Sequence, residues 1–186
     1  KVNNKLLVYG DLQLRSINYS SRFLDVDDSF TFFNPKFGLT YKFNELNSLY
    51  ASYARANREP NRSDYENGNP EPESLYDFEL GWRFAKSNTL INANLYYMGY
   101  KNQLVNTGAL DNVGAPIRAN SGESFRMGIE IDTNIKLSDK FSVTPNASLS
   151  INKNIDFVNT TSTGLEELGD TDISYSPSVV LGNAFI

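Results

Sequence analysis

The sequence contains no cysteine and no histidine among its 186 residues. These two absences exclude disulfides, a thiol nucleophile, a Ser–His catalytic pair and the usual zinc ligands. There is no Gly-rich phosphate loop and no acidic cluster with metal-ligand spacing, so no cofactor is expected. No apolar run reaches the roughly 18 residues that a membrane-crossing helix requires. The net charge of −5 argues against nucleic acid as a partner, because phosphate binding requires a basic surface.

Aromatic residues are abundant instead, and the 12 Phe and 11 Tyr favour strands over helices. Residues 124–138 alternate between apolar and polar side chains, which is the period of a strand. We expect eight such strands in antiparallel order. Their predicted ranges are 4–18, 30–43, 48–57, 74–84, 89–104, 123–137, 141–155 and 173–186. No segment shows a convincing 3.6-residue helical period.

The connections between these segments alternate strictly between short and long. The short ones are residues 44–47, 85–88 and 138–140, and the long ones are about 19–29, 58–73, 105–122 and 156–172. An up-and-down sheet with this pattern has all short turns at one end and all long loops at the other, as outer-membrane β-barrels do. Several segments exceed the about 9–11 residues that cross a bilayer. The sequence therefore predicts an all-β fold, a transmembrane β-barrel segment of about eight long strands.

Two alternatives of other classes remain open. The apolar faces could pack on a second sheet about 10 Å away, as in a soluble β-sandwich binding module. A barrel hydrolase needs a nucleophile with its base, and a glycosidase needs two carboxylates. No carboxylate pair stands out at a fixed spacing, so we expect a protein that is not an enzyme and has no catalytic residues.

Three stretches of the chain resemble TonB-dependent outer-membrane receptors. They are PKFGLTYKF at 35–43, LYASYARANREP at 49–60 and PESLYDFELG at 72–81. Two later stretches, NANLYYMGYKNQLVNTG and ANSGESFRMGIEID, fit the hairpin that follows in that family. The resemblance covers most of the chain, and its motifs occur in the right order.

The resemblance implies an energy-coupled receptor in the outer membrane of a Gram-negative bacterium. Its implied cargo is a scarce nutrient such as a ferric siderophore-like complex, with a carbohydrate or another nutrient as the alternative. The implied partners are membrane lipid, an N-terminal plug domain of the same protein and the TonB energy-transducing complex. Since the family's barrel has about 22 strands, we expect residues 1–186 to be part of a single β-barrel domain, without the plug and the closing strands.

Two groups of charged residues are the candidate functional residues. Arg55, Arg58, Glu59 and Arg62 lie where the third segment meets the second long loop. Their guanidinium groups could bind an anionic ligand, or they could form a strand-end ion-pair network. The second group is expected to face the barrel interior and to contact the plug or form interstrand charge ladders. It consists of Asp77, Glu79, Arg83, Arg126, Glu130, Asp132 and Lys136.

Overall fold

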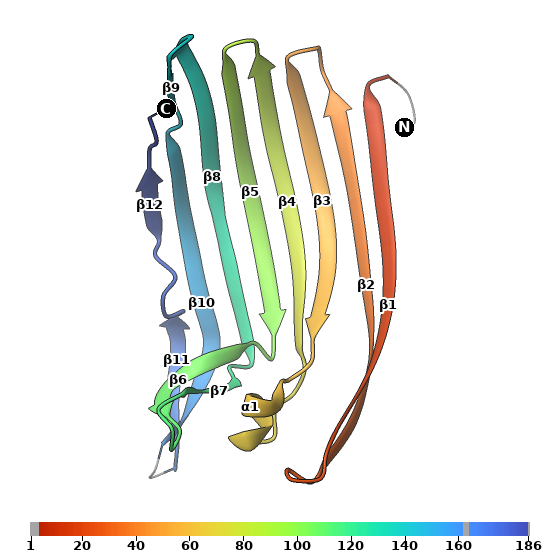
Figure 1. Ribbon diagram of the computed structural model, residues 1–186, viewed down its shortest axis with the longest axis vertical. Helices are drawn as coiled ribbons and strands as arrows, with labels where there is room; N and C mark the ends of the chain where they lie inside the picture. The colour runs from red at the N-terminus through yellow and green to blue at the C-terminus, as the bar shows by residue number, and fades with distance from the viewer. Residues whose placement is uncertain (1–3, 162–163, 186) are drawn as a thin grey trace.

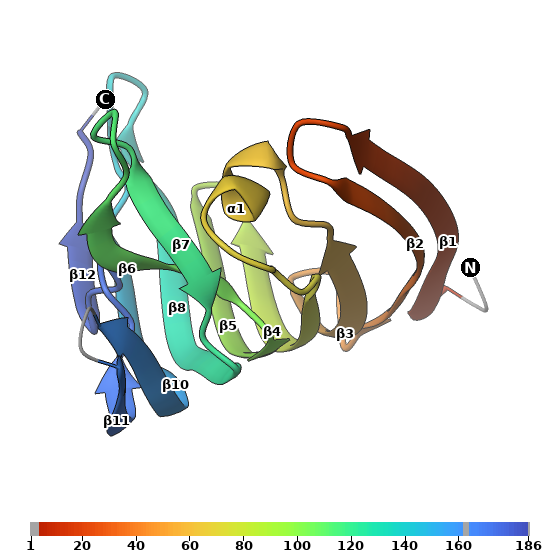
Figure 2. The same ribbon diagram turned by 90° about the horizontal axis from the view of Figure 1, so that it is seen from below.

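The computed structural model describes residues 4–161 and 164–185, and they form one long, curved antiparallel sheet (Figures 1 and 2). Seven strands follow one another across it. They are β1 (Leu6–Ser21), β2 (Val26–Lys42), β3 (Asn47–Arg58), β4 (Glu73–Lys86), β5 (Thr89–Lys101), β8 (Glu123–Ser138) and β10 (Asn146–Thr161). The eighth position is shared by β11 (Gly164–Asp172) and β12 (Val179–Gly182), which both pair with β10. The sheet does not close within this chain.

The predicted architecture is confirmed. All ladders are antiparallel, the short turns lie together at one end, and the longer connections lie at the other end (Figure 1). The long-connection end carries the helix α1 (Arg62–Glu66) and a separate hairpin of β6 (Leu104–Leu110) and β7 (Pro116–Asn120). We call this end the loop end and the opposite end the turn end. In Figure 2, α1 and β7 lie within the concave side of the sheet.

Several predicted boundaries are wrong. Most of the expected loop at 19–29 is strand, because the β1–β2 ladder continues to the pair Ser21–Val26. The expected loop at 156–172 is largely the β10–β11 hairpin, although residues 162 and 163 lie outside the described residues. These strands continue beyond the membrane because each further pair satisfies backbone N–H and C=O groups.

The last two predicted strands are interrupted at proline. Pro145 separates β9 (Phe141–Val143) from β10 in the segment predicted at 141–155, because proline cannot donate to a ladder. The strand predicted at 173–186 is mostly wrong, since only β12 is formed there and Ile186 lies outside the described residues. Tyr175 has a left-handed φ of +59° and is followed by Pro177, so the ladder stops between β11 and β12.

The helix α1 was not predicted from the sequence. It has five residues, which is too short to show a hydrophobic period. Its start is marked by a capping box, in which the Asn61 side chain accepts from the Asp64 backbone N–H and the Asp64 carboxylate accepts from the Asn61 N–H. Among the described residues, no helix is long and apolar enough to cross a membrane.

The two faces of the sheet differ sharply in polarity. The register places Leu80, Leu95, Ile129 and Leu149 in one row on the convex outer face. The side chains of Leu80, Leu95 and Leu149 are about half exposed, at 50%, 51% and 51%. No second sheet covers them in the described part of the chain, so the soluble β-sandwich alternative is not supported. The uncovered apolar face is the lipid-facing side of a transmembrane wall.

The concave inner face is polar, and on it tyrosine rings pack against glycines of the neighbouring strand. Tyr50 lies against Gly81 on the next strand, and Tyr96 lies against Gly128. A Cβ atom at Gly81 would collide with the Tyr50 ring, and one at Gly128 would collide with the Leu149 carbonyl oxygen and the Tyr96 hydroxyl, so only glycine leaves room for this packing. In each pair the tyrosine ring occupies the space that a side chain at the glycine would otherwise fill.

The face assignment predicts opposite outcomes for two arginine substitutions in β8. Ile129→Arg places a cation on the lipid side and should cost about 2–4 kcal/mol, whereas Asn134→Arg points to the inner face and should be tolerated. The measurement is the amount of folded protein that is assembled in outer-membrane fractions. Equal losses from both variants would contradict the assignment.

Candidate functional site

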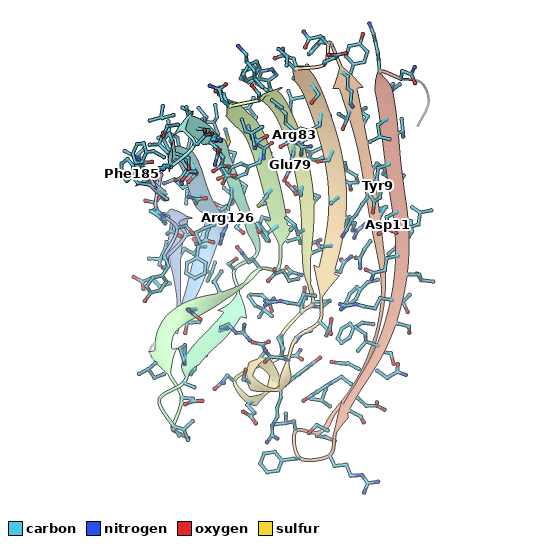
Figure 3. All side chains as sticks on the ribbon, turned by 45° about the horizontal axis from the view of Figure 1, so that its top comes forward. Tyr9, Asp11, Glu79, Arg83, Arg126 and Phe185 are labelled. Carbon is cyan, nitrogen blue, oxygen red and sulfur yellow. The ribbon has the colours of Figure 1, made fainter. Side chains whose placement is uncertain are left out.

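The seven charged residues predicted for the interior share the inner face of the sheet. The register aligns Glu79 with Ser52 and Tyr96, and it aligns Glu130 with Asn94 and Ser148. Figure 3 labels Glu79, Arg83 and Arg126 together with Tyr9 and Asp11, which the same register assigns to this face. The whole predicted set is Asp77, Glu79, Arg83, Arg126, Glu130, Asp132 and Lys136.

These residues do not form a ladder of ion pairs with one another. Of the ion pairs found within the described residues, none joins two members of the set. Arg83 lies over the ring of Tyr50, with its guanidinium carbon 4.4 Å from the ring centroid, and Lys136 contacts Asp139 in the adjacent turn at 2.6 Å. Their role in contacting a plug domain stays a prediction.

Part of the inner face is hollowed. Glu79, Arg126 and Glu130 line an open hollow of about 340 Å³ beside β12. A larger cavity of about 550 Å³ lies between the β6–β7 hairpin and the wall, and Arg126 also lines it. Both hollows mix charged, amide, hydroxyl and apolar side chains, which suits polar ligands or protein loops. Within the described ranges, no three acidic side chains gather to hold a metal ion.

The structure brings together three of the four residues predicted for ligand contact. Arg58, Glu59 and Arg62 line a hollow of about 400 Å³ at the loop end, facing Ile17 and Tyr19 of β1. Arg55 is not among them. It pairs with Tyr76 across the β3–β4 ladder, which places it on the outer face, and its contact with a ligand stays untested.

Each charged residue of this hollow has an acidic or basic partner. Arg58 contacts Glu73, its register partner on β4, at 2.8 Å, and Arg62 contacts Glu66 at 2.7 Å within α1. Glu59 accepts from the guanidinium of Arg15 on β1. The Arg62–Glu66 pair is exposed and contributes at most about 1 kcal/mol, whereas the Glu73 side chain in the Arg58 pair is only 15% exposed.

The α1 segment is joined to the β1–β2 hairpin through Tyr65. Its hydroxyl donates to the Asp28 carboxylate at 2.7 Å, and its ring stacks on that of Tyr19 with 5.1 Å between the centroids. Tyr65 is only 7% exposed. Burial, followed by the contact with Asp28, raises the pKa of the Tyr65 phenol well above its ordinary value of 10.0.

The same segment is joined on its other side to the β6–β7 hairpin. Arg118 of β7 contacts the carboxylate of Asp64 at 2.8 Å, and the Asp64 side chain is only 2% exposed. The Asn120 side chain accepts from the Glu71 N–H at 2.8 Å and donates to the carbonyls of Glu71 and Asn102 at 3.0 and 2.7 Å. Three loop-end elements that are separate in sequence are therefore linked into one layer over the concave side.

The sequence reasoning missed these linking residues. The capping role of Asp64 could have been predicted from the sequence, because Asn61-x-x-Asp64 is a capping-box pattern. No sequence pattern marks Arg118 or Tyr65, since their partners, Asp64 and Asp28, are distant in the sequence.

A single curved antiparallel layer with an apolar outer face, a polar inner face and elaborate connections at one end defines the wall of a large transmembrane β-barrel. The family described as "TonB dependent receptor-like, beta-barrel" matches residues 6–182. The chain therefore belongs to the TonB-dependent receptor β-barrel family. This family and its structural neighbours are transport receptors rather than enzymes.

Solved structures show the same fold at low sequence identity. The ferric-catecholate import receptor Fiu from E. coli K12 matches all of this chain with a TM-score of 0.73 at 14% identity, over 30% of its own length. The siderophore receptor PiuA from Acinetobacter baumannii matches all of the chain at 0.75 and 18% identity, over 29% of its length. The copper transporter OprC matches 82% of the chain at 0.67 and 15% identity, over 26% of its length.

The chain thus spans less than a third of the length of these structures. A comparison with curated proteins finds no match.

Removal of Arg118 tests the link between α1 and β7. Arg118→Ala leaves the buried Asp64 carboxylate without its cation, which should cost about 3 kcal/mol of local stability. The measurement is hydrogen exchange at the backbone amides of α1 and β7. The control is Glu66→Ala, which removes only an exposed pair and should cost about 0.3–0.5 kcal/mol. Equal exchange in the two variants would contradict a structural role for the Asp64–Arg118 pair.

The raised pKa of Tyr65 predicts a loss of loop-end order in alkali. A phenol whose pKa is raised by folding stabilises the fold below its ordinary pKa of 10.0, and this stabilisation is lost as the pH rises above that value. The protection factor of the α1 amides, which corrects for base-catalysed exchange, should therefore fall above about pH 10, and Tyr65→Phe should remove the Tyr65 contribution to that fall. An unchanged alkaline profile in Tyr65→Phe would show that another group controls it.

Proposed function

We propose that this chain is a wall segment of an energy-coupled receptor in the outer membrane of a Gram-negative bacterium, and that the complete protein imports a ferric siderophore-like complex. The observation that carries the proposal is the hollow at the loop end, where Arg58 and Arg62 line a space in front of β1. Guanidinium groups bind carboxylate and catecholate oxygens through paired donors. The names of Fiu and PiuA, which refer to ferric-catecholate import and to a siderophore, support this class of cargo.

The wall takes part in three ways in this proposal. Its outer face anchors the receptor in lipid, and its inner face, with Glu79, Arg126 and Glu130, contacts a plug domain of the same protein. The linked loop-end layer contributes to ligand capture through Arg58 and Arg62. Energy from the TonB complex then moves the plug, so the wall itself needs no catalytic residue. The same fold in a copper transporter indicates that the loop-end chemistry, rather than the barrel, selects the cargo.

An uptake assay with the complete protein tests this function. It would be produced in a host that lacks its own siderophore receptors, and binding and uptake of radiolabelled ferric catecholate and hydroxamate complexes would be followed. We expect that an uncoupler of the inner membrane stops uptake while surface binding persists. Binding of copper or maltodextrin in place of every ferric complex, or uptake that is unaffected by the uncoupler, would contradict the proposal.

A second assay tests the hollow itself. Arg62→Gln removes one charge-assisted contact with the ligand and should weaken its binding about tenfold. The matched control is Arg22→Gln, which removes the same charge from the exposed tip of the β1–β2 hairpin and should leave binding unchanged. Equal affinities for the two variants would exclude Arg62 from the binding surface.

A further inference from the structure

The connection from α1 to β4 contains the only Asn–Gly pair of the sequence, Asn67–Gly68. Both residues are exposed, and a Cβ atom placed on Gly68 would meet nothing within 4 Å. The backbone N–H of Gly68 has no hydrogen-bond partner among the described residues. An asparagine that precedes glycine is chemically labile, because no side chain hinders the approach of the glycine nitrogen to the asparagine amide carbon. The open loop offers the same freedom here.

Asn67 also closes the C-terminal end of α1. It is the C-cap residue, with φ −116° and ψ 4°, and its side-chain amide donates to the Ser63 carbonyl at 2.9 Å. At this ψ the Gly68 nitrogen is turned away from the Asn67 side-chain carbon, so the two atoms meet only when the end of α1 opens. A helix of five residues is marginal on its own, so local opening of this kind is frequent.

We propose that Asn67 is a site of spontaneous covalent modification, in which its side-chain amide becomes a carboxylate. The Gly68 backbone nitrogen loses its proton and attacks the Asn67 Cγ atom. The bond from Cγ to the side-chain nitrogen breaks, and ammonia leaves with the proton that Gly68 has lost. Water then opens the cyclic imide at one of its two carbonyl carbons, which yields aspartate or isoaspartate. No oxidant or reductant takes part.

The new carboxylate weakens the end of α1. It cannot donate to the Ser63 carbonyl, and it places a negative charge at a helix C-terminus, where the helix dipole disfavours anions. The last turn of α1, which the structure describes completely, has no basic residue that would offset this charge. Since α1 carries Arg62 of the loop-end hollow and Asp64 of the link to β7, the modification loosens both.

The same loop contains a natural control. Asn69 is exposed like Asn67, but it precedes Pro70. The proline nitrogen carries no hydrogen, so the imide cannot form at Asn69 by this route. A difference between the two asparagines therefore reports the following residue rather than exposure of the loop.

Peptide mass spectrometry of the complete protein tests the modification after incubation at neutral and at mildly alkaline pH. We expect the mass increase of an amide-to-acid change at Asn67, faster at the higher pH, and no such change at Asn69. Gly68→Ala should slow the reaction about tenfold, because its Cβ atom hinders the approach of the nitrogen. An unmodified Asn67, equal modification of Asn69, or an unchanged rate in Gly68→Ala would overturn the proposal.

Hydrogen exchange tests the consequence for α1. Asn67→Asp reproduces one product and should lower the protection of the α1 amides about threefold. The matched control is Asn69→Asp, which adds the same charge beyond the helix and should leave that protection unchanged. Equal protection in the two variants would overturn the proposed loosening of α1, and circular dichroism checks that both barrels are folded. The proposal is independent of the imported cargo, so it can fail while the transport function stands.

Discussion

The structure depends on one constraint, which is that backbone N–H and C=O groups in hydrocarbon must pair within the protein. Each group left unpaired there costs several kcal/mol. The ladders that join β1 to β5, β8 and β10 accordingly run across the membrane region, and the strands β2 and β3, of 17 and 12 residues, are longer than most soluble strands. Once the ladder is continuous, successive side chains must alternate between lipid and interior. The apolar outer face and the polar inner face are consequences of this single requirement.

Beyond the hydrocarbon the constraint is lifted, and the chain uses other ways to satisfy its polar groups. The helix α1 is closed by the Asn61–Asp64 capping box, and β6–β7 pairs with itself. Water alone would satisfy these segments, so their positions are set by side-chain contacts, chiefly Tyr65 with Asp28 and Asp64 with Arg118. The loop end can therefore vary in sequence and in ligand without disturbing the wall, as expected for receptors that share one barrel and differ in cargo.

The order and direction of the strands could be predicted from the sequence because the membrane enforces a strict period of two. The strand ends outside the membrane could not be predicted from the sequence. The ladders that extend to Ser21 and beyond Asp156 carry polar residues on both faces, so the alternation is lost there. Arg58 and Arg62 were grouped as candidate ligand contacts because both lie at a strand–loop junction, and that role stays a prediction. Arg55 could have been separated from them by parity, because Leu49, Ala51 and Tyr53 precede it on the outer face. Arg118 could not have been found, because its partner is fixed only by the folded loop layer.

The central claim is that alternate residues of each long strand face lipid and the barrel interior. This chain contributes no cysteine, so single substitutions to Cys at positions 126–127 and 129–133, made in the complete protein with any other cysteine replaced, report each position separately. The measurement is spin-label accessibility in membranes to oxygen, which concentrates in lipid, and to a water-soluble nickel chelate. The account predicts strict alternation, with Met127, Ile129 and Ile131 accessible to oxygen and Arg126, Glu130 and Asp132 not. A profile without alternation, or one with the two faces reversed, would contradict it.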